Sequence, residues 1–130
     1  MSAQDINDRT TLLLGFDLRE QIATAKRLAT EAAEARATAE YLEHLRKVVL
    51  ADEVLIAHRQ ARATGGKLTA LEAEATARVS DPYRTHLDGL RAAQAQRGTL
   101  YARSLAASQA VDLGFRQLSF LQTEIKLQDR

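Results

Sequence analysis

The sequence contains no cysteine, which excludes disulfide bonds and thiolate metal sites. It has one proline and only six glycines, so few residues can interrupt a helix. No run of residues approaches the ~18 consecutive apolar residues of a membrane-spanning helix, and the N-terminus lacks a basic region followed by a long apolar stretch. We therefore expect a soluble, intracellular protein with no membrane segment.

An excess of charge of one sign is also lacking, because the formal net charge is +1. A balance so close to zero argues against an extended nucleic-acid footprint. The charges are unevenly distributed, since residues 1–57 carry seven Lys/Arg against ten Asp/Glu and residues 58–130 carry eleven against seven. The second part is therefore mildly basic.

Large apolar side chains are few. Hydrophobic residues make up 45% of the chain, but 24 of them are alanine and 35 are larger. Alanine buries little area, and burial stabilises a fold by roughly 25 cal/mol per Å². Such a composition suits helices that approach closely, and a second copy of the chain would help to complete the core.

A first long helix is predicted over residues 17–63, because no residue in this range breaks a helix. Asp17 is placed to cap it, with Glu20 at the capping-box position, and Gly65-Gly66 ends it. Apolar residues recur along this helix at heptad spacing. They are Leu28, Ala35, Leu42, Val49 and Ile56, interleaved with Ala25, Ala32 and Ala39 and widened by Leu45, Val48 and Leu55.

Two further helices are predicted after the glycine pair. Thr69 and Glu72 form a capping box for a short helix over residues 70–79. Asp81 precedes Pro82 in a pairing that favours a helix start, and a helix follows over residues 82–127. Its apolar residues follow a three-four spacing: Tyr83, Leu87, Leu90, Tyr101, Val111, Phe115, Leu118 and Ile125, with Leu100, Ala107 and Leu121 in adjacent positions.

These helices predict an all-α fold, a long antiparallel helical hairpin that resembles a coiled coil and has a short connecting helix. The hairpin forms a single domain over residues 17–130, preceded by an N-terminal arm over residues 1–16 whose order the sequence leaves open. Matching of large to small side chains would place residues 42–49 near residues 92–107.

The apolar stripe of the second long helix is wider than one partner helix covers, so we expect two chains to dimerise into a four-helix arrangement. In a monomer, the segment Leu12–Phe16 would have to cover this stripe instead. The candidate oligomer-interface residues are Leu100, Val111, Phe115, Leu118, Leu121 and Ile125.

The three histidines are the natural place to look for a reactive site. His44 and His58 are fourteen residues apart, ~21 Å along one helix, which is too far to share an ion. His58 and His86 could meet near the connection between the long helices, with Asp88 or Glu53 nearby, but a structural zinc site needs four ligands. We favour solvated histidines on polar faces.

Other catalytic patterns are missing too. There is no G-x-S-x-G motif, and Gly65-Gly66-Lys67 has neither the length nor the preceding strand of a phosphate-binding loop. Glu43 precedes Lys47 by four residues, which is the spacing of an ordinary surface ion pair. We therefore predict a protein that is not an enzyme, with no catalytic residues, no metal and no cofactor.

One set of basic residues is suited to contact phosphates. The segment HRQARATGGK, residues 58–67, concentrates cations at the end of the first long helix, and arginines continue along the second. The alternative is that these residues only solubilise exposed helices. Tyr83 and Tyr101 are better placed in the core than for base stacking. The candidate nucleic-acid-binding residues are Arg59, Arg62, Lys67, Arg84, Arg91 and Arg97.

Two segments, AEYLEHLRKVVLADEVL (39–55) and EAEATARVSDPYRTHLDGLRAAQ (72–94), carry a family resemblance. The matching residues are Glu40, Tyr41, Arg46, Lys47, Leu50 and Ala51, then Tyr83, Leu87, Gly89, Leu90 and Ala93. In order and spacing they resemble small helical proteins that double-stranded DNA bacteriophages encode among recombination and replication genes. The resemblance covers roughly residues 39–122. It implies a role in DNA handling or in engaging a host factor, in the cytoplasm of a bacterial host cell.

Together, the sequence and the resemblance predict a non-catalytic helical interaction protein derived from a phage. It would assist DNA recombination or replication through a protein partner or through weak DNA contact. The alternative is a homo-oligomeric coiled-coil scaffold or inhibitor that acts only on a host protein. Salt-dependent DNA binding would separate the two.

Overall fold

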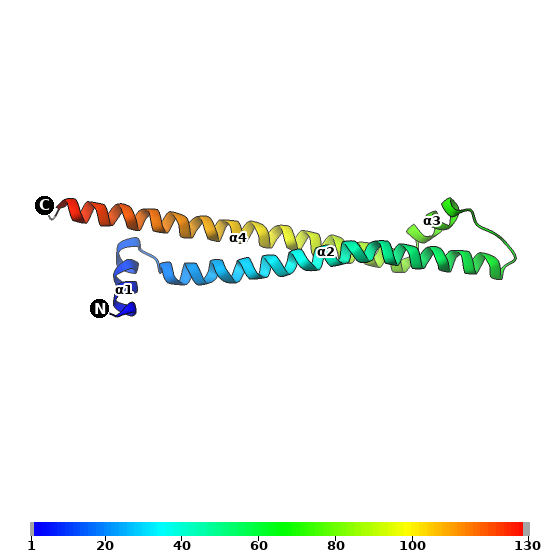
Figure 1. Cartoon of the computed structure of the whole chain (residues 1–130), viewed down its shortest axis with the longest axis horizontal. Helices are drawn as coiled ribbons and strands as arrows, with labels where there is room; N and C mark the ends of the chain where they lie inside the picture. The colour runs from blue at the N-terminus through cyan, green and yellow to red at the C-terminus, as the bar shows by residue number, and fades with distance from the viewer. Residues whose placement is uncertain (1, 129–130) are drawn as a thin grey trace. The chain divides into compact units, whose positions relative to one another are not determined.

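The computed structural model describes residues 2–128, with the side chains of all of them except residues 7 and 13. Over this range the chain forms four helices: α1 (Ala3–Leu14), α2 (Leu18–Ala63), α3 (Ala70–Arg78) and α4 (Asp81–Gln128) (Figure 1). No strand occurs among these residues, so the predicted all-α class is confirmed. The bounds predicted for the three later helices differ from the observed ones by at most one residue at an end.

The chain divides into two compact units. One, the central unit, is Glu34–Gly98, and the other, the terminal unit, combines Met1–Ala33 with Thr99–Arg130. The central unit contains α3 together with the C-terminal part of α2 and the N-terminal part of α4. The terminal unit contains α1 with the remaining parts of the two long helices.

Side-chain caps and glycines set the helix ends. The predicted cap of α2 is confirmed, because the backbone N–H of Glu20 donates to Asp17 Oδ1 at 3.1 Å. The capping box of α3 is confirmed as well, with Thr69 and Glu72 each accepting from the other's backbone N–H. After α2, Gly65 has a φ of 78°, in the left-handed region that glycine adopts without strain.

The start of α4 differs slightly from the prediction, because Ser80 caps the helix in place of Asp81. Ser80 Oγ accepts from the backbone N–H of Tyr83 at 3.4 Å and donates to the Ala77 carbonyl at 2.8 Å. Pro82 is therefore the second helical residue, a position whose N–H has no partner within the helix in any case.

Residues 1–16, predicted as an arm, contain the helix α1. Ser2 and Asp5 close a capping box at its start, and Gly15 ends it with a φ of 76°. The segment has no extended apolar periodicity of the kind that identifies α2 and α4 in the sequence. The capping box was therefore the available signal for this helix, and sequence reasoning overlooked it.

In the central unit, α2 and α4 run antiparallel, because Leu42 contacts His86 and Arg46 contacts Tyr83. The predicted register, with residues 42–49 near residues 92–107, is wrong. The reason is that α3 lies back alongside the C-terminal part of α2 (Figure 1), so α4 begins well before the end of α2. Small side chains allow this close packing. The buried residues of the unit are Ala39, Ala57, Ala73, Ala77, Tyr83 and Leu90.

In the terminal unit, Phe16 and Leu18 pack closely against Gly114 of α4. A Cβ atom at this position would lie 2.9 Å from Leu18 Cδ1 and 3.3 Å from the Phe16 ring. Because Gly114 faces the packed side, its neighbour Phe115 is turned outward and is 51% exposed. Sequence reasoning placed Tyr101 in the core, and Tyr101 is in fact 64% exposed. That placement is wrong, since small residues such as Gly114 occupy the packed side of α4 in this unit.

Candidate interaction surfaces and the polar network

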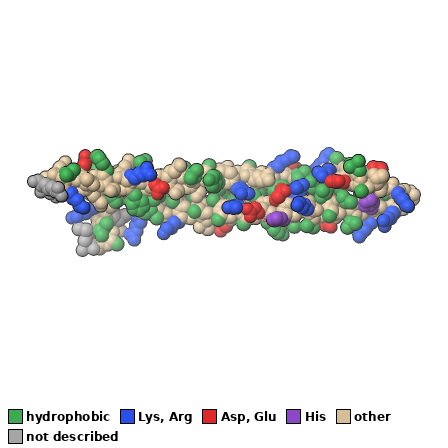
Figure 2. Space-filling view, turned by 45° about the horizontal axis from the view of Figure 1, so that its top comes forward, with side chains coloured by type: hydrophobic (Ala, Val, Ile, Leu, Met, Phe, Trp, Pro, Cys, Tyr) green, Lys and Arg blue, Asp and Glu red, His purple; other side chains and the backbone are tan. Residues whose placement is uncertain are grey.

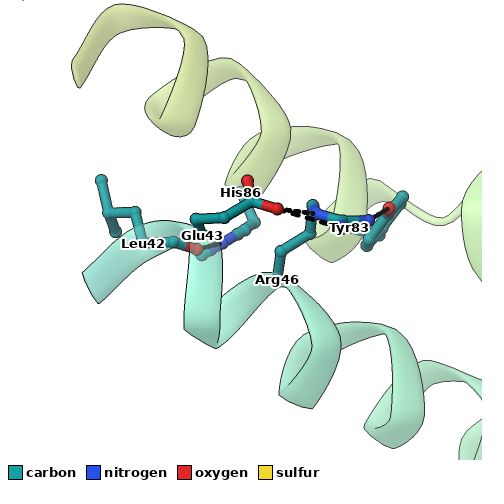
Figure 3. A network of polar contacts seen from close by, with 5 residues as sticks. All are labelled: Leu42, Glu43, Arg46, Tyr83 and His86. Carbon is teal, nitrogen blue, oxygen red and sulfur yellow. Dashed lines mark hydrogen bonds and ion pairs between the residues drawn. The ribbon is translucent and has the colours of Figure 1, made fainter. Parts of the chain in front are cut away.

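A polar network joins α2 to α4 in the central unit (Figure 3). The Arg46 guanidinium donates to Glu43 Oε1 at 3.1 Å and to the Tyr83 hydroxyl at 3.5 Å. These contacts, that with Tyr83 first and that with Glu43 second, raise the pKa of Arg46. Arginine is already charged at every physiological pH. Arg46 therefore acts as a fixed cation that orients Tyr83, and it is unsuited to proton transfer.

His86 occupies the same region and bonds to the backbone of α2. Its Nε2 lies 2.7 Å from the Leu42 carbonyl oxygen (Figure 3). A carbonyl oxygen can only accept, so Nε2 must carry the proton. The expectation that the histidines are solvated is therefore wrong for His86, which is half-buried between the helices. His44 is exposed and His58 is half-buried.

The carboxylates and histidines do not assemble into a metal site in the part of the chain that the structure describes. No group of three or more potential ligands converges there. Glu43 pairs with Arg46 at 3.1 Å, which corrects the predicted pairing with Lys47. The observed spacing is three residues, and it places Arg46 toward α4, whereas Lys47 remains exposed. The network thus supports helix packing.

The six candidate nucleic-acid-binding residues lie in the central unit, but they do not share one environment. Five are exposed: Arg59, Arg62, Lys67, Arg84 and Arg91. Arg97 is half-buried, and its charge adds to the effect of Arg36 in lowering the pKa of Glu40. Arg91 Nη1 lies 3.9 Å from Asp88 Oδ1. Basic and acidic side chains are interspersed on the face shown in Figure 2.

The candidate oligomer-interface residues lie in the terminal unit, where α4 already has intrachain neighbours. Leu14 lines the same pocket as Phe120 and Leu121, and Phe16 lies against Gly114. The N-terminal segment therefore covers part of the α4 stripe. Four of the six candidates are half-buried: Leu100, Val111, Leu118 and Leu121. The other two, Phe115 and Ile125, are exposed.

A row of large apolar side chains lies on the outer face of α2 in the central unit. Tyr41, Val48 and Leu55 are spaced by seven residues and are 61%, 53% and 53% exposed. Val48 is nine residues from both Ala39 and Ala57, which are buried. Nine residues are two and a half turns, so Val48 points away from the packed side. We call these three residues the outer row.

Sequence reasoning assigned Val48 and Leu55 of the outer row to the packed side of α2. That assignment is wrong, because the alanines occupy this side. The nine-residue offset between Val48 and two alanines was visible in the sequence. Valine and leucine were nevertheless assigned to the core, because their side chains are larger and more apolar than that of alanine. A second exposed row, Leu113, Phe120 and Leu127, occurs on α4 in the terminal unit. Phe120 of that row shares a pocket with Leu14.

Comparison of the chain with protein-family models, with curated proteins and with solved structures gives no match. None of the helices among residues 2–128 is both long and apolar enough to span a membrane. The class that the described geometry supports is an all-helical protein with long paired helices and exposed apolar rows.

Proposed function

We propose that this chain is a non-catalytic helical interaction protein that assists DNA recombination or replication, as the resemblance to phage proteins implies. It would act through a protein partner or through weak contact with DNA. The observation that carries the proposal is the outer row of α2, because three large apolar side chains at heptad spacing remain more than half exposed. Exposed apolar side chains aligned in this way are typical of helix-to-helix recognition.

The polar groups support an interaction role better than a chemical one. Arg46, Glu43 and Tyr83 satisfy one another, and His86 bonds to the backbone of Leu42. Arg46–Tyr83 and His86–Leu42 thus join α2 to α4, and Glu43 holds Arg46 in place. A general acid or base needs a side chain that can reach a substrate proton. These side chains are already hydrogen-bonded to one another or to the helix backbone.

The DNA branch of the proposal concerns the exposed basic residues. Binding of labelled single- and double-stranded oligonucleotides, measured by fluorescence anisotropy, should be weak and independent of sequence. It should fall steeply between about 50 and 200 mM salt, because each phosphate contact releases counterions. Arg62→Gln and Lys67→Gln should each flatten the salt dependence by roughly one unit. Arg36→Gln is the matched control, because Arg36 is engaged with Glu40 at 3.0 Å.

The protein branch concerns the outer row. Affinity capture from a bacterial lysate with the wild-type chain and with Val48→Glu should recover a partner only with the wild type. The partner, once purified, should bind the wild-type chain and bind the variant weakly. The proposal is overturned if DNA binding is absent at low salt and no purified partner distinguishes the two chains.

The second candidate function is a homo-oligomeric coiled-coil scaffold or inhibitor that acts only on a host protein. Two observations favour it: Asp88 lies beside Arg91, and Arg97 is half-buried. Both reduce the basic surface that is available to phosphates. Absence of salt-dependent DNA binding, together with a partner that requires Val48, would select this candidate.

A further inference from the structure

The outer row of α2 is bordered by charged residues that have no partner of their own. Glu34, Asp52 and Arg59 are exposed, and none makes a side-chain hydrogen bond or ion pair within residues 2–128. Away from this face, Arg36 pairs with Glu40 and Arg46 with Glu43 within α2. The face that carries the apolar row therefore also carries three charges that have no partner among the described residues.

The positions of these charges decide which helix could pack on the outer row. Asp52 and Arg59 follow Leu45 at heptad spacing, and Glu34 precedes Tyr41 by seven residues. All of them therefore lie along the same stripe of α2. A second α2 helix packed in parallel would align Glu34 with Glu34, Asp52 with Asp52 and Arg59 with Arg59. Like charges at the centre of a helix pair oppose association.

An antiparallel second copy gives the opposite result. When the two helices cross between residues 46 and 47, Glu34 of each chain faces Arg59 of the other. In the same register, the Tyr41 hydroxyl faces the Asp52 carboxylate, Leu45 faces Val48, and Leu55 faces Thr38. Each of these pairings occurs twice because the arrangement is symmetric. The apolar layers are then enclosed by an ion pair at either end.

We propose that the outer face of α2 is a homodimer interface, on which a second copy of this chain packs antiparallel with Glu34 opposite Arg59. The contact runs from Glu34 to Arg59, ~37 Å of helix. It buries Tyr41, Val48 and Leu55, the three residues of the outer row. This surface differs from the α4 residues that the sequence indicated, four of which are half-buried within the chain.

This interface rests on the proposed function, because it names the partner of the outer row. In this form, the chain presents its remaining surfaces in duplicate, related by a twofold axis. A chain that remains a monomer and binds a purified host protein through the outer row would contradict the interface and leave the proposed function intact.

Disulfide trapping tests both the contact and its direction. The chain has no cysteine, so Glu34→Cys and Arg59→Cys each introduce a single thiol and leave the outer row unchanged. One variant carries a tag that separates the two chains by size. After mild oxidation of the equimolar mixture, the mixed disulfide should dominate, because a disulfide requires Cα atoms within about 7 Å. Cysteines at the same position would be ~37 Å apart in the antiparallel dimer.

Charge exchange tests the pairing without a covalent bond. Glu34→Arg should weaken dimerisation by about tenfold, because it replaces two attractive pairs with two repulsive ones. Glu34→Arg combined with Arg59→Glu should restore the wild-type dissociation constant. Both are measured by analytical ultracentrifugation, with circular dichroism to verify that helicity is unchanged.

A charge within the row should abolish the dimer. Val48→Glu should give the mass of a single 14.3 kDa chain in light scattering, whereas the wild type gives twice that mass. Leu71→Glu is the matched control, since Leu71 is 78% exposed on α3, outside the row. A monomeric wild type overturns the interface. So does a disulfide that forms in Glu34→Cys alone, which would indicate a parallel pair, or a failure of the double charge exchange to restore binding.

Discussion

The His86 Nε2 atom of α4 lies 2.7 Å from the carbonyl oxygen of Leu42 of α2, across 44 positions of sequence. Three residues earlier in α4, Tyr83 receives a hydrogen bond from Arg46, which is four residues later in α2. The two contacts lie about one helical turn apart on each helix. The later residue of α2 contacts the earlier residue of α4. They therefore fix the antiparallel register of the central unit.

Removal of the His86 hydrogen bond should destabilise the protein. His86→Phe retains a ring of comparable size but cannot donate to Leu42. We expect the free energy of unfolding to fall by about 1 kcal/mol, the usual value for a hydrogen bond between protein groups. Urea denaturation measures this change. His86→Gln, which keeps a donor on a side chain of similar reach, should recover part of the loss. Equal stability of His86→Phe and the wild type would show that the contact contributes nothing.

Tyr83 should matter for its ring much more than for its hydroxyl. The Arg46 to Tyr83 contact is long, at 3.5 Å, so Tyr83→Phe should cost less than about 1 kcal/mol. The ring is buried, with 3% of the residue exposed, so Tyr83→Ala should cost roughly 3–5 kcal/mol through lost burial and an internal cavity. Thermal and urea unfolding of the two variants should therefore differ widely. Similar losses in both would assign the stabilisation to the hydroxyl.

Two glycines of α4 should respond oppositely to alanine. A Cβ at Gly98 meets nothing within 4 Å, so Gly98→Ala should stabilise the helix by about 1 kcal/mol through its higher helix propensity. A Cβ at Gly114 would lie 2.9 Å from Leu18 Cδ1, and Leu18 is buried, so Gly114→Ala should lose this gain or destabilise the protein. Melting temperatures from circular dichroism compare the two. Equal stabilisation by both substitutions would contradict the close packing at Gly114.

The Glu40 carboxylate should titrate below its ordinary range. The hydrogen bond from Arg36, followed by the charge of Arg36, lowers the pKa of Glu40 in the folded chain. A lowered folded pKa means that this group stabilises the fold above its unfolded pKa, and that the contribution is lost as pH falls through the folded pKa. NMR titration of the Glu40 side-chain carbon should show the low pKa in the wild type and a higher one in Arg36→Gln. Arg36→Lys should be intermediate, because it keeps the charge and loses the guanidinium geometry.

Sequence alone determined where the later helices begin and end. Asp17, Ser80, Thr69 and Gly65 act within a few residues of their own position, through side-chain caps and a positive φ. Such local chemistry does not depend on the rest of the fold. The capping box of Ser2 and Asp5 is equally local, and it could have revealed α1 from the sequence.

Tertiary structure decided which side of each long helix is packed, and therefore which residues form the candidate surfaces. Size alone favoured Val48 and Tyr101 as core residues, but Ala39 and Gly114 occupy the packed sides because they let the helix backbones approach. The register depended on α3 lying back along α2, which moved His86 opposite Leu42. Heptad spacing shows that a helix has an apolar stripe. When alanine supplies a stripe of its own, only packing against a partner determines which of the two stripes turns inward and which remains exposed.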